Sequence, residues 1–185
     1  METLTRYSHR KDPFYFSFQG RAIWILRDSD SDAHALYRKE KEHIIAELCV
    51  ELIDRCGWHL SNIHIGELVP VVSQDGWSYP EADILLTDGA GRPCTLIKVA
   101  PRENFDAETV ASLQELFLLA HALRLDASES PKTLVYCTRW HEGIATKERV
   151  IAIDYGRFQS YASWDSAARP SSDTLPHGRS EIQSK

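Results

Sequence analysis

Several features that mark common protein classes are missing from this sequence of 185 residues. Its four cysteines, Cys49, Cys56, Cys94 and Cys137, include no CxxC pair, so a zinc ribbon is not expected. No apolar run reaches the roughly 20 residues that span a bilayer, and residues 1–13 are too polar for a secretory signal. These absences predict a cytoplasmic protein with reduced thiols and no membrane partner.

Sequence motifs for common chemistries are absent as well. There is no glycine-rich phosphate loop and no GxSxG nucleophile motif, and the eight histidines show neither HxH nor HExxH spacing. The acidic stretch at residues 28–34 lacks the glycine and the closing glutamate of a calcium loop. His141 and Glu142 follow Trp140 in a predicted loop, where solvated polarity explains them more simply than a metal does. The absence of these motifs therefore predicts no cofactor.

Basic charge is also in short supply. Lysine and arginine number 21 against 27 aspartate and glutamate residues, which gives a formal net charge of −6. Proteins that bind nucleic acid without specificity usually carry a basic surplus, because phosphate neutralisation supplies most of their affinity. The acidic balance lowers the expectation of bulk nucleic-acid binding and leaves room for a local basic groove. The most basic stretch, residues 6–27, mixes arginines with aromatic residues, and we interpret it as a half-buried hairpin.

The sequence does contain enough apolar residues to build a core. It is 43% apolar and 26% charged, which is ordinary for a globular protein, and its length suits one domain. Towards the C-terminus, Ser, Pro, Asp, Gly and Arg replace the apolar pattern. We therefore predict a single domain over residues 1–166 and a flexible tail over residues 167–185.

Hydrophobic periodicity predicts an α/β fold. Two short strands are expected within residues 14–27, joined by a turn at Gln19-Gly20. The elements expected after this hairpin are a helix over residues 33–56, strands over 63–72, 81–88 and 94–100, a helix over 107–125, and strands over 132–138 and 149–155. The strands at 81–88 and 94–100 are almost continuously apolar, which indicates the buried centre of a sheet with helices on both faces.

The segment YPEADILLTDGAGRPCTLIKVAP, residues 79–101, resembles the central hairpin of the PD-(D/E)xK nucleases. It is similar in particular to the N-terminal nuclease-like domain of type I restriction enzyme motor subunits. The resemblance covers about residues 38–138. It implies a restriction-endonuclease-like core, with a central mixed β-sheet flanked by helices, and here an N-terminal β-hairpin precedes that core. The site residues that it implies are a helix glutamate, Glu42 or alternatively Glu40, the strand aspartate Asp83, and the helix glutamine Gln114.

The chain departs from the family pattern at two positions of the second hairpin strand. Lys98 stands where the family has an acid, and Ala100 stands where it has a lysine. A register shifted by one residue would place Ile97 and Val99 there instead, and both are apolar. An engineered alanine would explain position 100 but not position 98.

This departure bears directly on the chemistry. Phosphodiester cleavage at such a site needs Mg²⁺, which at least two carboxylates usually hold. Asp83 alone is a poor metal site, and Lys98 would repel a cation there. At ~4 Å two unit charges interact by roughly 4 kcal/mol at an effective dielectric near 20. We therefore expect an ion pair between Lys98 and Asp83 in place of a metal.

Three functions remain open at this point. The first is a catalytically degenerate nuclease-like module that binds nucleic acid, either DNA or RNA, or a protein in a DNA-processing or defence assembly. The second is an active Mg²⁺-dependent endonuclease with a rearranged site, in which Asp83 holds the metal, Glu81 faces the same way, Glu42 and Gln114 approach, and Lys98 acts as a displaced lysine. The third is a structural interaction domain without a nucleic-acid role, with a protein partner or a second copy of itself.

Overall fold

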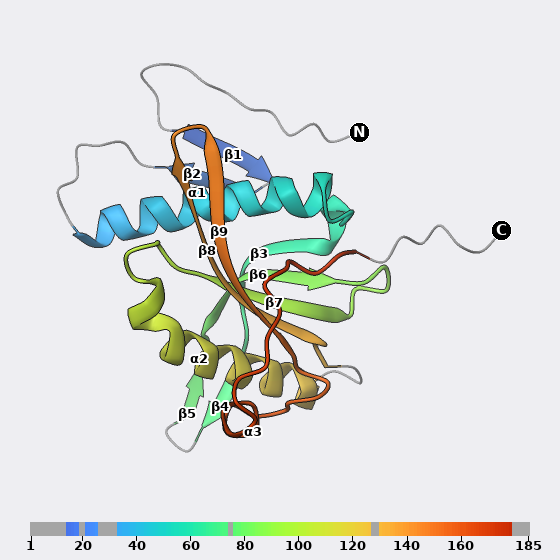
Figure 1. Cartoon of the computed structure of the whole chain (residues 1–185). Coiled ribbons are helices and arrows are strands. Elements are labelled where there is room, and N and C mark those ends of the chain that lie inside the picture. Colours follow the sequence, from blue (N-terminus) through green and yellow to red (C-terminus); the bar gives the residue numbers. More distant parts are fainter. Residues whose placement is uncertain (1–13, 19–20, 26–32, 74–75, 127–129, 179–185) are drawn as a thin grey trace.

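The computed structural model describes residues 14–18, 21–25, 33–73, 76–126 and 130–178. A five-stranded mixed sheet forms its centre (Figure 1). The strands, in spatial order, are β3 (Ile63–Leu68), β6 (Glu81–Thr87), β7 (Pro93–Val99), β8 (Thr133–Glu142) and β9 (Ala145–Asp154). Neighbouring strands are antiparallel except β7 and β8, which are parallel.

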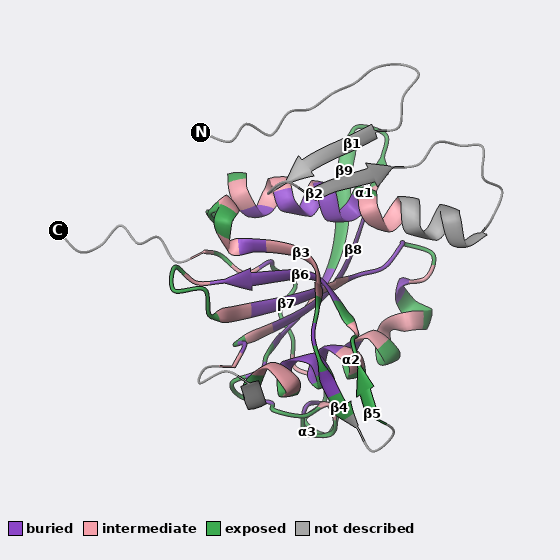
Figure 2. Ribbon diagram, turned by 180° about the vertical axis from the view of Figure 1, so that it is seen from behind, coloured by how far each residue is buried: buried purple, intermediate pink, exposed green. Residues whose placement is uncertain are grey.

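Two long helices flank this sheet, one on each face (Figures 1 and 2). Helix α1 (Ala33–Asp54) precedes the sheet in the chain, and α2 (Phe105–Asp126) supplies the crossover that the parallel pair β7 and β8 requires. The fold is therefore α/β, with a central mixed sheet flanked by helices, as the sequence predicted. The prediction that β6 and β7 are adjacent and antiparallel is also confirmed.

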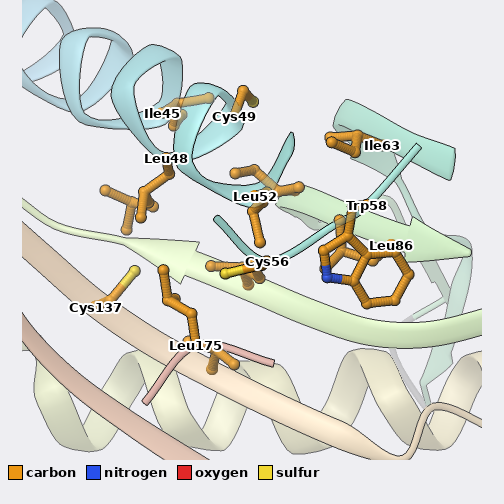
Figure 3. Packing of buried hydrophobic residues seen from close by; sticks show 14 of the residues in the cluster. Ile45, Leu48, Cys49, Leu52, Cys56, Trp58, Ile63, Leu86, Cys137 and Leu175 are labelled. Carbon is orange, nitrogen blue, oxygen red and sulfur yellow. The ribbon is translucent and has the colours of Figure 1, made fainter. Parts of the chain in front are cut away.

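Helix α1 ends at Asp54, close to the expected end at residue 56, and Gly57 follows it. Gly57 has a φ of +74°, a conformation that glycine adopts without steric cost. The Trp58 N–H donates to the Leu52 carbonyl at 2.9 Å, which closes the helix end. Trp58 then packs back into the core beside Leu52 and Cys56 (Figure 3).

Smaller elements surround the central sheet. Antiparallel strands β1 (Phe14–Phe18) and β2 (Arg21–Ile25) form the predicted N-terminal hairpin, whose turn at 19–20 lies outside the described residues. The other elements are the short helix η1 (Leu60–Asn62), the antiparallel strands β4 (Val71–Ser73) and β5 (Gly76–Ser78), and helix α3 (Tyr161–Ser166). Strand β3 is an edge strand of the sheet, and the single strand expected over residues 63–72 is divided at Pro70 into β3 and β4.

The two faces of the sheet bury separate hydrophobic clusters. The buried β6 and β7 residues in the cluster with α1 are Ile84, Leu86, Ile97 and Val99, and those in the cluster with α2 are Ala82, Leu85 and Leu96. Strands β6 and β7 are therefore covered on both faces, which explains why their sequences are almost continuously apolar. Among the described helices, none combines the length and the apolar character that crossing a membrane requires.

The C-terminal segment differs from the prediction. A flexible tail was predicted from residue 167, but residues 167–178 pack against the domain. Leu175 is buried in the α1 cluster, and the Trp58 indole Nε1 donates to the Pro176 carbonyl at 2.8 Å (Figure 3). The Gly178 N–H donates to the Cys56 carbonyl at 2.8 Å. Residues 179–185 lie outside the described residues.

Three of the four cysteines are buried in the same cluster. Cys49 and Cys56 lie on and just after α1, and Cys137 lies on β8 (Figure 3). All are free thiols, and burial raises the pKa of Cys49 to about 12 and raises that of Cys56 and Cys137 as well. They are core residues, as the sequence predicted for Cys49 and Cys56.

Candidate functional site

Asp83 is the centre of the candidate site. Its side chain is only 1% exposed, and both carboxylate oxygens have partners. Oδ1 lies 2.7 Å from Nζ of Lys41 on α1, and Oδ2 accepts a hydrogen bond from the Val99 N–H at 2.7 Å. The carboxylate therefore lies on the α1 face of the sheet, between the helix and strand β7.

The residue-by-residue pairing of β6 with β7 begins at Ile84, which pairs with Ile97, and does not include Asp83. At Asp83 the side-chain carboxylate accepts a hydrogen bond from the Val99 N–H. Side-chain alternation breaks here, because Asp83 and Ile84 are consecutive and both contact the α1 side. This break in side-chain alternation explains how the Asp83 carboxylate lies on the α1 face, where regular alternation would place only apolar residues.

Two opposing effects act on the pKa of Asp83. Burial raises it above its usual value, because the charged form loses its hydration. The Lys41 ammonium and the Val99 N–H act in the opposite direction, and Lys98 adds a weaker favourable charge. The net direction is upward, so the folded protein holds this carboxyl proton more tightly than an unfolded chain does.

The expected ion pair between Lys98 and Asp83 is wrong. Lys98 Nζ lies 2.5 Å from Oε2 of Glu115 on α2, and Asp83 pairs with Lys41 instead. The reason is the facing of β7: Ile97 and Val99 belong to the α1 cluster, while Leu96 and Ala100 pack with α2, on the side where Lys98 meets Glu115. The positions on the side of Asp83 are therefore Ile97 and Val99, the shifted register that the sequence left open.

The remaining predicted site residues lie at other positions around the sheet. Glu81 is exposed, and its carboxylate lies against Gly66 of β3, where a Cβ would come within 3.2 Å of Oε1. Glu42 is half-buried on α1, one residue after Lys41. Gln114 is exposed on α2, which covers the opposite face of the sheet. Glu40, the alternative helix acid, accepts a hydrogen bond from the Arg102 N–H at 3.4 Å.

Sequence reasoning missed Lys41 as the partner of Asp83. The resemblance implies an acid on this helix, and Lys41 lies between the two acids that fit it, Glu40 and Glu42. One residue corresponds to about 100° of rotation around a helix, so the identity of the inward-facing residue depends on an exact register. The apolar neighbours Ile44, Ile45 and Leu48 define the buried side of α1 only to within about one position.

His141 and Glu142 also differ from the prediction. They lie at the end of β8 rather than in a loop, because β8 and β9 continue as a long hairpin past α1 (Figure 1). His141 Nε2 lies 2.7 Å from Oε1 of Glu47 on α1, and Glu142 Oε1 accepts a hydrogen bond from the Trp140 indole at 2.9 Å. We call residues 138–149 the β8–β9 arm.

An open depression of about 430 Å³ lies elsewhere, near the β6–β7 turn. Its lining includes Ser61, His64, Glu67, Thr87 and Asp88. Neither Asp83 nor Lys41 lines this depression. The Asp83 side chain is 1% exposed and that of Lys41 is 24% exposed, so the carboxylate itself is covered and only the lysine reaches the surface.

Comparison with known proteins adds no family to this description. A scan against protein-family models and a search of curated proteins both return no match for this chain.

Proposed function

We propose that this chain is a nuclease-like module without cleavage chemistry, which acts by binding a partner. The observation that carries the proposal is the environment of Asp83. Its two oxygens are satisfied by the Lys41 ammonium and the Val99 N–H inside a hydrophobic core. The arrangement of sheet and helices supports the resemblance to the PD-(D/E)xK core, and the contents of the site argue against its activity.

Magnesium chemistry is unfavourable at Asp83 for two reasons. Mg²⁺ takes oxygen ligands in octahedral geometry and keeps several waters, whereas Asp83 is 1% exposed between apolar residues. The Lys41 ammonium also occupies the position beside Oδ1 that a cation would take. The β7 residues on this face, Ile97 and Val99, offer neither a second carboxylate nor a lysine to orient an attacking water.

A protein partner suits the charge arrangement better than nucleic acid. Lysines and arginines that bind phosphate must be available, and many of those described already pair with carboxylates. These are Lys41, Arg55, Arg92, Lys98, Arg102, Arg139, Arg149 and Arg169. Breaking such pairs would reduce the gain from counterion release that drives nucleic-acid binding.

Exposed apolar side chains support the same conclusion. Leu68, Val72, Trp77 and Tyr79 are each more than half exposed, and Val72 and Trp77 face each other across strands β4 and β5. Aromatic residues of this kind are enriched in protein interfaces. Nucleic acid remains the second candidate, because the exposed Arg102 guanidinium stacks over the Trp140 ring at 4.5 Å, a pairing that also suits bases.

The test is a cleavage assay of the full chain on double- and single-stranded DNA and on RNA, with Mg²⁺ or Mn²⁺. We expect no metal-dependent product. Fluorescence anisotropy on the same substrates at physiological salt is the binding measurement, and we expect affinities no tighter than the non-specific range of about 10⁻⁴–10⁻⁶ M. Metal-dependent cleavage that Asp83→Asn abolishes would overturn the proposal, and tight salt-dependent binding that Arg102→Ala removes would favour nucleic acid over protein.

A gain-of-function variant is the matched control. Lys41→Glu would place a second carboxylate beside Asp83 and remove the competing ammonium. We expect Mn²⁺ to raise the melting temperature of Lys41→Glu by more than it raises that of the wild type, with both measured in the His141→Ala background so that no other metal site contributes. The double substitution Lys98→Glu with Ala100→Lys would restore the acid and the lysine of the family pattern, but it would place both charges towards α2 and not beside Asp83.

A further inference from the structure

Three metal-ligating side chains meet on the outer side of α1, away from Asp83. His43 and Glu47 are four residues apart on the helix and therefore lie on the same face. His141 reaches them from the β8–β9 arm, which runs past the helix (Figure 1). His141 Nε2 lies 2.7 Å and His43 Nε2 lies 3.1 Å from the same Glu47 oxygen, Oε1.

The separations are close to those of a metal site. One ligand atom from each residue can be chosen so that all three lie within 4.8 Å of one another. Around Zn²⁺, ligands at ~2.0–2.2 Å in tetrahedral geometry are roughly 3.2–3.5 Å apart. The two contacts to Glu47 are shorter than this ligand spacing, and small rotations of the half-exposed histidines would lengthen them to it. The two imidazole rings already stand 67° apart, with their centroids separated by 6.4 Å.

A neighbouring hydroxyl orients one of the ligands. Thr146 Oγ1 lies 3.4 Å from Nδ1 of His141, which directs Nε2 towards Glu47. Histidines that bind metals characteristically use the other ring nitrogen for such a second contact. Since β8 pairs His141 with Thr146 directly across the arm, the register of the arm itself holds this contact.

We propose that His43, Glu47 and His141 bind a divalent transition metal, with Zn²⁺ as the best match. Two imidazoles and one carboxylate suit zinc, and they are a poor set for Mg²⁺, which prefers oxygen. The side chains of His43 and His141 are 47% and 46% exposed, so water can complete the coordination. The bound ion would tie α1 to the β8–β9 arm. The inference does not depend on the proposed function, because none of these residues contacts Asp83.

The sequence alone could not predict this site. The His43–Glu47 spacing fits a helix, but His141 lies 94 positions after Glu47, and only the fold brings the two together. Without a metal, the same three residues would form a partly exposed hydrogen-bonded cluster, which is the alternative that the experiment must distinguish.

The experiment is a calorimetric titration of the full chain with Zn²⁺ alone, followed by melting curves with and without the metal. We expect a single site whose occupation raises the melting temperature. His43→Ala and His141→Ala should each weaken binding by at least about tenfold and remove the thermal shift, since even outer-shell changes typically cost 10–100-fold. His121→Ala, an exposed histidine on α2, is the matched control and should bind as the wild type does.

Folding of the variants is checked by melting in the presence of a chelator, where all should resemble the wild type, because the replaced side chains are about half exposed. Co²⁺ supplies a second readout, since its visible absorption in a low-symmetry site should disappear in His141→Ala. No saturable Zn²⁺ binding, or equal affinity in the wild type and in His141→Ala, would overturn the proposal.

Discussion

At the residue scale, the structure is notable for buried charges that each have a partner. Asp83 pairs with Lys41, and Arg139, whose side chain is 6% exposed, pairs with both Glu51 and Glu148. Removing one member of such a pair is costly, because the other is left uncompensated in a poorly hydrated place. Two substitutions test this in different ways.

Replacing Lys41 by methionine should lower the free energy of unfolding by about 2 kcal/mol at pH 7, less than for a fully buried pair, because Lys41 is partly exposed. The pKa of Asp83 is raised on folding, so its contribution to stability is present at acidic pH and is lost as the pH rises through the folded pKa. Loss of Lys41 raises that pKa further, since the nearest cation is gone. The deficit should therefore shrink towards pH 4, where protonated Asp83 needs no counter-charge.

Urea unfolding at both pH values measures this difference. Lys147→Met, at an exposed lysine of β9, serves as the control and should change stability by less than about 0.5 kcal/mol. A deficit of the same size at pH 4 and pH 7 would mean that lost packing, rather than the charge on Asp83, causes the effect.

Replacing Arg139 by alanine should cost about 3 kcal/mol, because Glu51 and Glu148 lose their shared cation next to the core. The loss lies at the low end for a buried pair, since Glu51 keeps Arg55 and the Glu148 side chain is 36% exposed. The control uses the same acid: Arg55 also pairs with Glu51 at 2.7 Å, but its side chain is 77% exposed. Arg55→Ala should therefore cost less than about 1 kcal/mol. Chemical denaturation of both variants would show whether burial sets the difference, and equal losses would refute that view.

At the scale of elements, the residues with strong periodicity were predicted well. The helix at 33–56 and the strands at 81–88 and 94–100 match α1, β6 and β7 closely, since each buries a continuous apolar side. The strands β8 and β9 are longer than predicted, because residues 141–149 of the β8–β9 arm are exposed and mostly polar and give no apolar pattern. Helix α3 was missed because its described core contact comes mainly from a single residue, Trp164.

The C-terminal segment shows the limit of composition as a guide. Its order depends on a few contacts, chiefly those of Leu175, Pro176 and Gly178 with the end of α1. At Gly178 an added Cβ would lie 2.8 Å from the Gly57 carbonyl oxygen, so the two backbones approach closely. One buried leucine among polar residues has no periodicity, and sequence analysis therefore could not recognise it.

Leu175→Ala should lower the free energy of unfolding by about 2–3 kcal/mol, the usual cost of emptying a leucine site in a core. It should also make the segment after residue 166 more sensitive to proteolysis, because less apolar area holds it in place. Thr174→Ala, at the exposed neighbouring position, should leave both properties unchanged. Limited proteolysis with mass spectrometry would reveal the first cleavage point, and a first cleavage in the loop near residue 130 in both variants would contradict the expectation.

At the scale of the whole molecule, the sequence predicted the architecture but only part of the site. Asp83 was expected on a strand at the buried centre of the sheet, and it lies on β6 there, while its functional role stays a prediction. The sequence predicted neither its partner Lys41 nor the side to which Lys98 points, since both depend on the local pairing of β6 with β7. Strict alternation places Lys98 on the side of Asp83, and the break reverses that relation without any mark in the sequence.

The three buried cysteines can report when the core opens, because their thiols react only when they are exposed. Thiol reagents attack the thiolate, and burial both shields Cys49, Cys56 and Cys137 and raises their pKa. Half-buried Cys94 should be alkylated first, whereas the other three should react only after α1 separates from the sheet. If mass spectrometry shows these three cysteines to be alkylated together, the rate of that step gives the rate at which α1 separates from the sheet, and no cysteine has to be introduced.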